Sequence, residues 1–186
     1  MKTEKFNLEN VMKLTKLESE LDLNMAQALA SKLRWMAKED KTLVGVRKHV
    51  KSLIKDYEQA HWSDDASISE NQIEESFEAE KLVAFSSEFG SARKEAIKKA
   101  LKMHNLKQTD LAQILGHRDS YMSELINGVM PFSKEDVVII HRLFKINFDK
   151  LIDPFIKMDT RDRIKAALVK LNRPQLKLKH EDLVVV

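Results

Sequence analysis

The sequence has no cysteine, only 4 glycines and 3 prolines, and no long apolar run. Without cysteine the chain can form neither a disulfide nor a thiolate site for catalysis or metal binding. So few glycines and prolines leave little material for the tight turns of a many-stranded sheet. No stretch approaches the roughly 18 apolar residues that a membrane-spanning helix needs, and residues 1–10 are too charged for a signal peptide. We therefore expect a cytoplasmic protein with no membrane association.

The residues that are abundant favour helices. Hydrophobic residues make up 43% and charged residues 33% of the 186 residues, which is enough for a globular protein with a core. Leu, Lys, Ala, Glu and Ile dominate the sequence, and most of these are strong helix formers. We therefore predict an all-α fold.

The net charge of +3 is unevenly distributed. Residues 1–88 hold 13 Lys and Arg against 17 Asp and Glu, for −4, whereas residues 89–152 hold 11 against 7, for +4. Residues 153–186 add 8 against 5, for +3. An acidic front and a basic back indicate parts with different partners, although chance variation along a charged surface would look the same.

The first 63 residues are predicted to form a helical hairpin. Apolar residues recur at helical spacing within residues 8–39 and again within residues 46–57, and the second run stops near residues 61–65. Asn24 is a plausible cap between two helices in the first run. We assign residues 1–63 to an N-terminal domain that binds a partner.

An acidic connector is expected to follow this hairpin. Residues 64–80 contain seven acidic residues and no basic residue, and they are predicted to become helical around Ile73 and Phe77. Gly90, with the serine that follows it, indicates a break in the chain before the basic part. We therefore assign residues 64–91 to a partly helical connector.

Five short helices are predicted within residues 92–153. Each of five successive segments carries its apolar residues on one helical stripe. Ser133, with Asp136 three residues later, resembles a helix-start signal. Pro154 ends the run, because proline cannot continue a helix.

The C-terminal extension, residues 154–186, is predicted to hold one more helix and a short strand-like tail. Residues 160–171 are amphipathic, and the tail from Gln175 alternates apolar and polar residues before it becomes fully apolar. Such a strand needs a partner, either a second copy of the chain or another protein. A tail without fixed structure is the alternative.

Residues 108–128, QTDLAQILGHRDSYMSELING, predict two short helices that meet at a fixed angle. Gly116 can adopt a left-handed conformation without steric cost, so it ends the first helix and turns the chain. Asp119 or Ser120 can then cap the second helix. The pattern resembles the helix-turn-helix of the Cro and phage-repressor-like family, also called XRE, and the resemblance covers residues 92–153.

The resemblance implies a way of binding double-stranded DNA. The second helix would lie in the major groove, and the start of the first helix would meet backbone phosphate. Acidic residues in such a helix oppose the phosphates but can accept hydrogen bonds from cytosine. Lys98 and Lys107, within a lysine-rich cluster, would supply further phosphate contacts, unless that cluster is only a solvated helix face. The other residues expected to contact the operator are Gln108, Thr109, Arg118, Asp119, Ser120, Ser123, Glu124 and Asn127.

The N-terminal part resembles the front of HigA-type antitoxins. The segment KLESELDLNMAQALASKL leads to SLIKDYEQAHW, in which Tyr57, Glu58, His61 and Trp62 carry the likeness. The resemblance implies a protein that binds a small basic ribonuclease toxin and represses its own operon as a homodimer. An acidic helical surface would suit a basic partner. Trp35, Tyr57 and Trp62 would be either anchors at that interface or core residues of the hairpin.

No arrangement of residues indicates an enzyme. The 6 histidines show no metal-ligand spacing, and neither a phosphate-binding glycine loop nor a Ser/His/Asp arrangement is visible. His61 lies near Asp64 and Asp65, which a solvated helix end explains better than acid–base chemistry does. We therefore predict no catalytic residues, no cofactor and no metal.

The sequence as a whole predicts a dimeric, sequence-specific DNA-binding repressor, which in the HigA-type interpretation also neutralises a toxin. One alternative is a stand-alone regulator of the XRE family whose N-terminal domain senses a ligand or another protein. A second alternative is an interaction module that keeps the fold without binding DNA.

Overall fold

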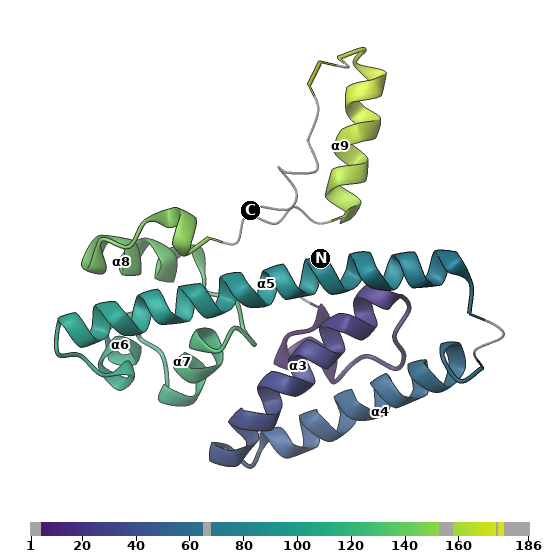
Figure 1. The fold of residues 1–186 in the computed structure, drawn as a ribbon. Coiled ribbons are helices and arrows are strands. Elements are labelled where there is room, and N and C mark those ends of the chain that lie inside the picture. Colours follow the sequence, from purple (N-terminus) through teal and green to yellow (C-terminus); the bar gives the residue numbers. More distant parts are fainter. Residues whose placement is uncertain (1–4, 65–67, 153–157, 174, 177–186) are drawn as a thin grey trace.

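The computed structural model describes residues 5–64, 68–152, 158–173 and 175–176 (Figure 1). Every regular element within these residues is a helix, as the sequence predicts. None of the described helices is both long enough and apolar enough to cross a bilayer. From residue 177 onward, the predicted strand-like tail lies outside the described residues. The elements are α2 (Leu8–Val11), α3 (Glu20–Glu39), α4 (Leu43–His61), α5 (Glu70–Met103), α6 (Gln108–Leu115), α7 (Asp119–Ile126), α8 (Lys134–Phe144), the 3-10 helix η2 (Phe148–Lys150) and α9 (Met158–Lys170).

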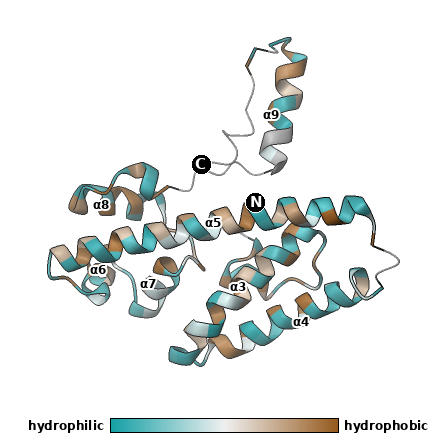
Figure 2. Cartoon of the chain, viewed as in Figure 1, coloured by the Kyte–Doolittle hydropathy of each residue, from teal (hydrophilic) through white to brown (hydrophobic). Residues whose placement is uncertain are grey.

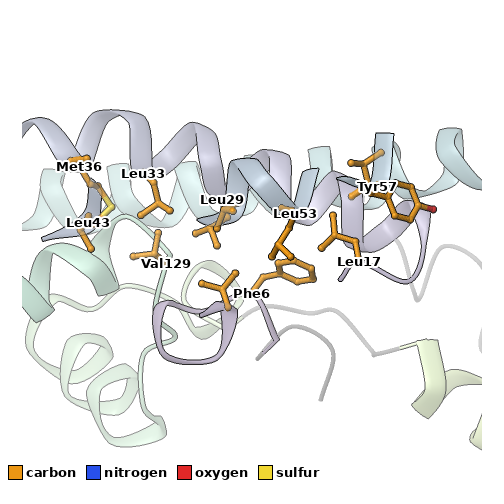
Figure 3. Packing of buried hydrophobic residues seen from close by; sticks show 14 residues of the cluster. Phe6, Leu17, Leu29, Leu33, Met36, Leu43, Leu53, Tyr57 and Val129 are labelled. Carbon is orange, nitrogen blue, oxygen red and sulfur yellow. The ribbon is translucent and has the colours of Figure 1, made fainter. Parts of the chain in front are cut away.

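Helices α3 and α4 form the predicted hairpin. α3 begins after Ser19, whose hydroxyl oxygen accepts a hydrogen bond from the backbone N–H of Asp22, and a serine at this position stabilises a helix start. Both helices alternate hydrophobic and hydrophilic residues along their length (Figure 2), and their apolar side chains bury a common core (Figure 3). This N-terminal cluster comprises Phe6, Val11, Leu17, Leu23, Ala26, Leu29, Leu33, Met36, Ala37, Leu43, Val50, Leu53, Tyr57 and Val129.

The first turn of α3 corrects one prediction and holds a buried carboxylate. α3 runs through Asn24, whose side chain donates to the carbonyl oxygen of Glu20, so the cap predicted at Asn24 is wrong. The Glu20 side chain is buried, and its Oε1 accepts from the Tyr57 hydroxyl and from Trp62 Nε1, both at 3.0 Å. Burial and this hydrogen bond raise the pKa of Tyr57. Because a buried carboxylate is costly without donors, these contacts hold the two helices in one register.

Helix α5 is one continuous helix of 34 residues, so the break predicted at Gly90 and Ser91 is wrong. A glycine inside a helix costs only about 1 kcal/mol relative to alanine, and packing along α5 outweighs that cost. α5 lies along α3 (Figure 1), and its last turns bury Ile97 and Leu101 in a second core. Residues 70–91 of the predicted connector are therefore continuous with the first helix of the next unit.

The last turns of α5 join α6, α7, α8 and η2 in a second helical unit, which has the five predicted helices in the predicted order. The predicted start of α8 is confirmed, because the Ser133 hydroxyl and the Asp136 carboxylate each accept from the other residue's backbone N–H. The C-terminal cluster comprises Ile97, Ala100, Leu101, Leu111, Ala112, Met122, Leu125, Ile126, Met130, Val137, Ile140, Ile146 and Leu151.

The two clusters meet at the turn after α7. Val129 belongs to the N-terminal cluster (Figure 3), although the next residue, Met130, belongs to the C-terminal cluster. The Lys32 ammonium group on α3 donates to the carbonyl oxygen of Gly128 at 3.0 Å. Burial and the nearby Arg93 guanidinium lower the pKa of Lys32. The hairpin is thus packed directly against the C-terminal unit.

Candidate nucleic-acid interface

Gly116 turns the chain between α6 and α7, as the sequence predicts. It ends α6 in the left-handed conformation, with φ +71°, which glycine adopts at little cost. The N–H of His117 then donates to the carbonyl oxygen of Ala112 at 2.8 Å, which satisfies a carbonyl group at the end of α6. Only Gly116, His117 and Arg118 separate the two helices, so the angle at which the helices meet is closely constrained.

Helix α7 begins earlier than predicted. Its N-cap is Arg118, and Asp119 is already the first helical residue, so the prediction that Asp119 or Ser120 caps this helix is wrong. The His117 ring contacts the buried carboxylate of Asp136 on α8, with Nε2 and Oδ1 2.9 Å apart. This contact holds the turn against α8. Because His117 is fixed in this way, the next residue, Arg118, is the only one left to precede the first turn of α7.

The first half of α7 is open to solvent. Arg118, Asp119 and Ser120 are exposed, whereas Met122 and Leu125, on the opposite face, are fully buried in the C-terminal cluster. The helix is thus held to the body of the domain by its apolar face, and three of the predicted DNA contacts stand on its outer face. Their side chains are accessible to a duplex.

The second half of α7 is partly covered. Ser123, Glu124 and Asn127 are half-buried. The Oδ1 of Asn127 accepts from the Lys94 ammonium group at 2.8 Å, and its Nδ2 donates to the carbonyl oxygen of Ser123 at 2.8 Å. Asn127 therefore ties the end of α7 to α5, and a contact between Asn127 and a base would have to share or replace these hydrogen bonds.

Glu124 faces acidic residues of the N-terminal hairpin. Burial raises the pKa of its carboxyl group, and the carboxylates of Asp40 and Glu9 raise it further, whereas Arg118 lowers it. Asp40 is the C-cap of α3, so the turn between α3 and α4 lies near Glu124. The sequence carried no signal for this proximity, because helical periodicity does not specify which separate units lie close together.

The predicted phosphate contacts come together at the start of α6. Lys98 and Lys107 line one surface hollow of about 470 Å³ together with Gln108, and Lys102 adds a third ammonium group to it. Gln108 is the first residue of α6, where unpaired backbone N–H groups and the helix dipole attract an anion. Thr109, the next residue, is exposed. The three ammonium groups make this hollow positively charged.

The three aromatic residues predicted as partner anchors differ in their surroundings. Tyr57 is 8% exposed and Trp62 is half-buried, and both donate to Glu20, so they hold the hairpin together. Trp35 is 64% exposed on α3, with the Lys38 ammonium nitrogen 4.0 Å from the centroid of its ring. Of the three, Trp35 has the surface expected of a partner anchor. No cluster of three acidic or histidine side chains suited to a metal ion occurs in the described part of the chain.

Comparison with protein families matches residues 97–151 to a family described as helix-turn-helix. The match runs from the last turns of α5 to the end of the C-terminal cluster and covers 55 of the 186 residues. This part of the chain is an XRE-family helix-turn-helix domain, of the kind found in DNA-binding transcription regulators. No curated protein and no solved structure matches the chain.

Proposed function

We propose that the protein is a sequence-specific transcriptional repressor that binds its operator through the helix-turn-helix domain at residues 97–151. One observation carries the proposal: the exposed first half of α7 belongs to the same small domain as the lysine-lined hollow at the start of α6. Phosphate contacts supply affinity that depends on salt, and contacts with base edges supply sequence dependence. The domain carries side chains suited to both.

The outer face of α7 suits the edges of the bases in the major groove. The Arg118 guanidinium group can donate two parallel hydrogen bonds to guanine, and the carboxylates of Asp119 and Glu124 can accept from the amino group of cytosine. Ser120 and Ser123 can bond several bases. Because the carboxylates repel phosphate, they add selectivity and lower the overall affinity. In a homodimer, two copies of α7 would enter successive major grooves about 34 Å apart.

Within this function we propose a HigA-type antitoxin that neutralises a small basic ribonuclease toxin and represses its own operon. Support comes from the order of the parts along the chain and from the exposed ring of Trp35 on the N-terminal hairpin. The alternative is a stand-alone regulator whose hairpin senses a ligand or another protein. Co-purification with a small basic protein encoded by an adjacent gene supports the antitoxin, and an isolated gene supports the stand-alone regulator.

The test is binding to the DNA upstream of the protein's own coding sequence, measured by fluorescence anisotropy. We expect specific binding, and we expect Arg118→Ala to weaken it by about 1–3 kcal/mol, or about 5- to 150-fold, while binding to unrelated duplexes changes less. Arg163→Ala is the matched control, because Arg163 is exposed on α9, on the other side of α5 from α7 (Figure 1). A specific complex that Arg118→Ala leaves unchanged would contradict the assignment of α7.

A further inference from the structure

The acidic N-terminal part contains a basic region that its total charge conceals. Residues 31–55 hold eight Lys and Arg against two acidic residues, whereas the rest of residues 1–88 holds five against fifteen. The basic region spans the second half of α3, the turn after it and most of α4. The net charge of −4 for residues 1–88 is therefore an average over a basic region, residues 31–55, and a more strongly acidic remainder.

Four of these cations line one groove between α3 and α4. The groove, which we call the α3–α4 groove, has a volume of about 860 Å³, and its walls include the cations Arg47, Lys48, Lys51 and Lys55 of α4. Glu58 is the only acidic residue in its walls, and its Oε1 accepts from Gln27 Nε2 at 3.1 Å. The groove is therefore strongly positive along most of its length.

The positive charge of the α3–α4 groove is not neutralised within the part of the chain that the structure describes. None of its four cations forms an ion pair with a described residue. The Nε of Arg47 is buried and has no hydrogen-bond acceptor there. A buried donor without an acceptor is costly.

The groove has a fixed place relative to the helix-turn-helix domain. Lys32 and Val129 join α3 to the turn after α7, and Asp40, at the start of the α3–α4 turn, is close enough to Glu124 to raise the pKa of its carboxyl group. α4 and α7 both lie on the same side of α5 (Figure 1). The basic wall of α4 thus extends away from α7 along one side of the molecule.

We propose that the α3–α4 groove is a second binding site for the phosphate backbone of DNA, next to the segment that α7 reads. The duplex that enters α7 continues past the α3–α4 turn, and Arg47, Lys48 and Lys51 bind its phosphates. These contacts offset the repulsion from Asp119 and Glu124 and lengthen the DNA that each bound protomer protects. The inference rests on the proposed function, because it requires that α7 bind DNA.

An acidic protein segment is the other polyanion that could occupy this groove. DNA is favoured because the α3 helix that forms one wall of the groove is packed against a domain whose family is found in DNA-binding regulators. An acidic protein segment could bind the groove wherever the groove lay relative to the helix-turn-helix domain. The test below separates the two occupants.

The experiment compares Lys48→Gln/Lys51→Gln with Lys165→Gln/Lys170→Gln in the full chain. The second pair removes the same charge from α9, on the other side of α5 (Figure 1). Binding to the upstream DNA and to a duplex of mixed sequence is measured at several salt concentrations, with hydroxyl-radical footprints of the specific complex. Because each lost phosphate contact lowers the salt slope by about 1, we expect the first pair to lower it by about 2 per bound protomer for both duplexes, and the footprint to shorten beside each bound protomer.

The control pair should leave both the slope and the footprint unchanged. An unchanged slope and footprint in Lys48→Gln/Lys51→Gln, together with a loss of specific binding in Arg118→Ala, would overturn the second site and leave the proposed function intact. The second site would also be overturned, with the proposed function intact, if Lys48→Gln/Lys51→Gln weakened the binding of polyglutamate and left the binding of DNA unchanged. Absence of any DNA binding by the wild type would overturn both proposals.

Discussion

At the scale of single residues, Glu124 shows how one side chain can be shared between two parts of the molecule. It lies on α7 among the predicted DNA contacts, yet it is half-buried and its carboxyl group is affected by Asp40 and Glu9 from the N-terminal hairpin. Burial and two like charges all favour its neutral form. A duplex would add more negative charge and favour that form further, so protonation of Glu124 and DNA binding should reinforce each other.

We therefore predict that DNA affinity rises as the pH falls through the raised pKa of Glu124, and that Glu124→Gln loses this part of the pH dependence. Because the pKa of Glu124 is raised in the folded state, ionisation of its carboxyl group lowers the free energy of unfolding. The stability linked to this group is therefore present at low pH and is lost as the pH rises through the raised pKa. Glu124→Gln should therefore be at least as stable as the wild type at neutral pH. Anisotropy titrations across pH and urea unfolding check both expectations. Glu88→Gln, an exposed position on α5, is the control, and a retained pH dependence in Glu124→Gln would contradict the assignment.

At the scale of helices, two glycines differ in what determines their conformation: backbone freedom at Gly116 and helix packing at Gly90. Gly116 adopts the left-handed conformation that ends α6. Gly90 lies within α5, and a Cβ atom added there would have no neighbouring atom within 4 Å. The same residue type is needed for its backbone freedom at one position and only tolerated at the other. The packing of α5 on α3 and on the C-terminal cluster explains why Gly90 does not break the helix.

The same substitution at these two glycines should have opposite effects. Gly90→Ala is expected to stabilise the protein by roughly 0.5–1 kcal/mol, because alanine loses less backbone entropy in a helix. Gly116→Ala is expected to destabilise it by about 1–2 kcal/mol, because a left-handed conformation is costly for residues with a Cβ atom. The free energy of unfolding in urea measures both changes. Destabilisation by Gly90→Ala would indicate that α5 is interrupted at this position.

At the scale of the whole molecule, the two clusters are joined closely enough to unfold together. Val129 carries the chain of the helix-turn-helix domain into the N-terminal cluster, Lys32 bonds the turn before it, and Leu8 packs against both clusters. α5 adds a continuous helix that lies along α3 and ends in the C-terminal cluster. A change in one cluster should therefore be felt in the other.

We predict that a change confined to the C-terminal cluster shifts the unfolding of the N-terminal hairpin. Both tryptophans, Trp35 and Trp62, lie in the hairpin, so their fluorescence reports its unfolding. Ile140→Val, at a fully buried position of the C-terminal cluster, should lower the free energy of unfolding by about 0.5–1.5 kcal/mol, with the same midpoint by fluorescence and by circular dichroism. Ile114→Val, at an exposed position of α6, should change neither. A fluorescence transition that Ile140→Val leaves in place would show that the units unfold separately.

The features that could be predicted from the sequence are those set by residues close together along the chain. The helix-turn-helix depends on a glycine, a two-residue turn and apolar residues three or four positions apart, all within about twenty residues, so residues 108–128 were predicted with the correct turn at Gly116. The start of α8 at Ser133 was predicted for the same reason. The predicted cap of α7 is wrong, because the turn before this helix is held by a contact between His117 and Asp136 of α8, which are 19 residues apart in sequence.

The sequence by itself determined the helical class, the turn at Gly116 and the lysine cluster before α6, because neighbouring residues along the chain set these features. Only the tertiary structure decided that α5 is unbroken, that Tyr57 and Trp62 hold Glu20, and that the α3–α4 turn lies beside α7. These features depend on packing between residues far apart in sequence, and burial of apolar surface depends on which faces meet, which no local pattern specifies.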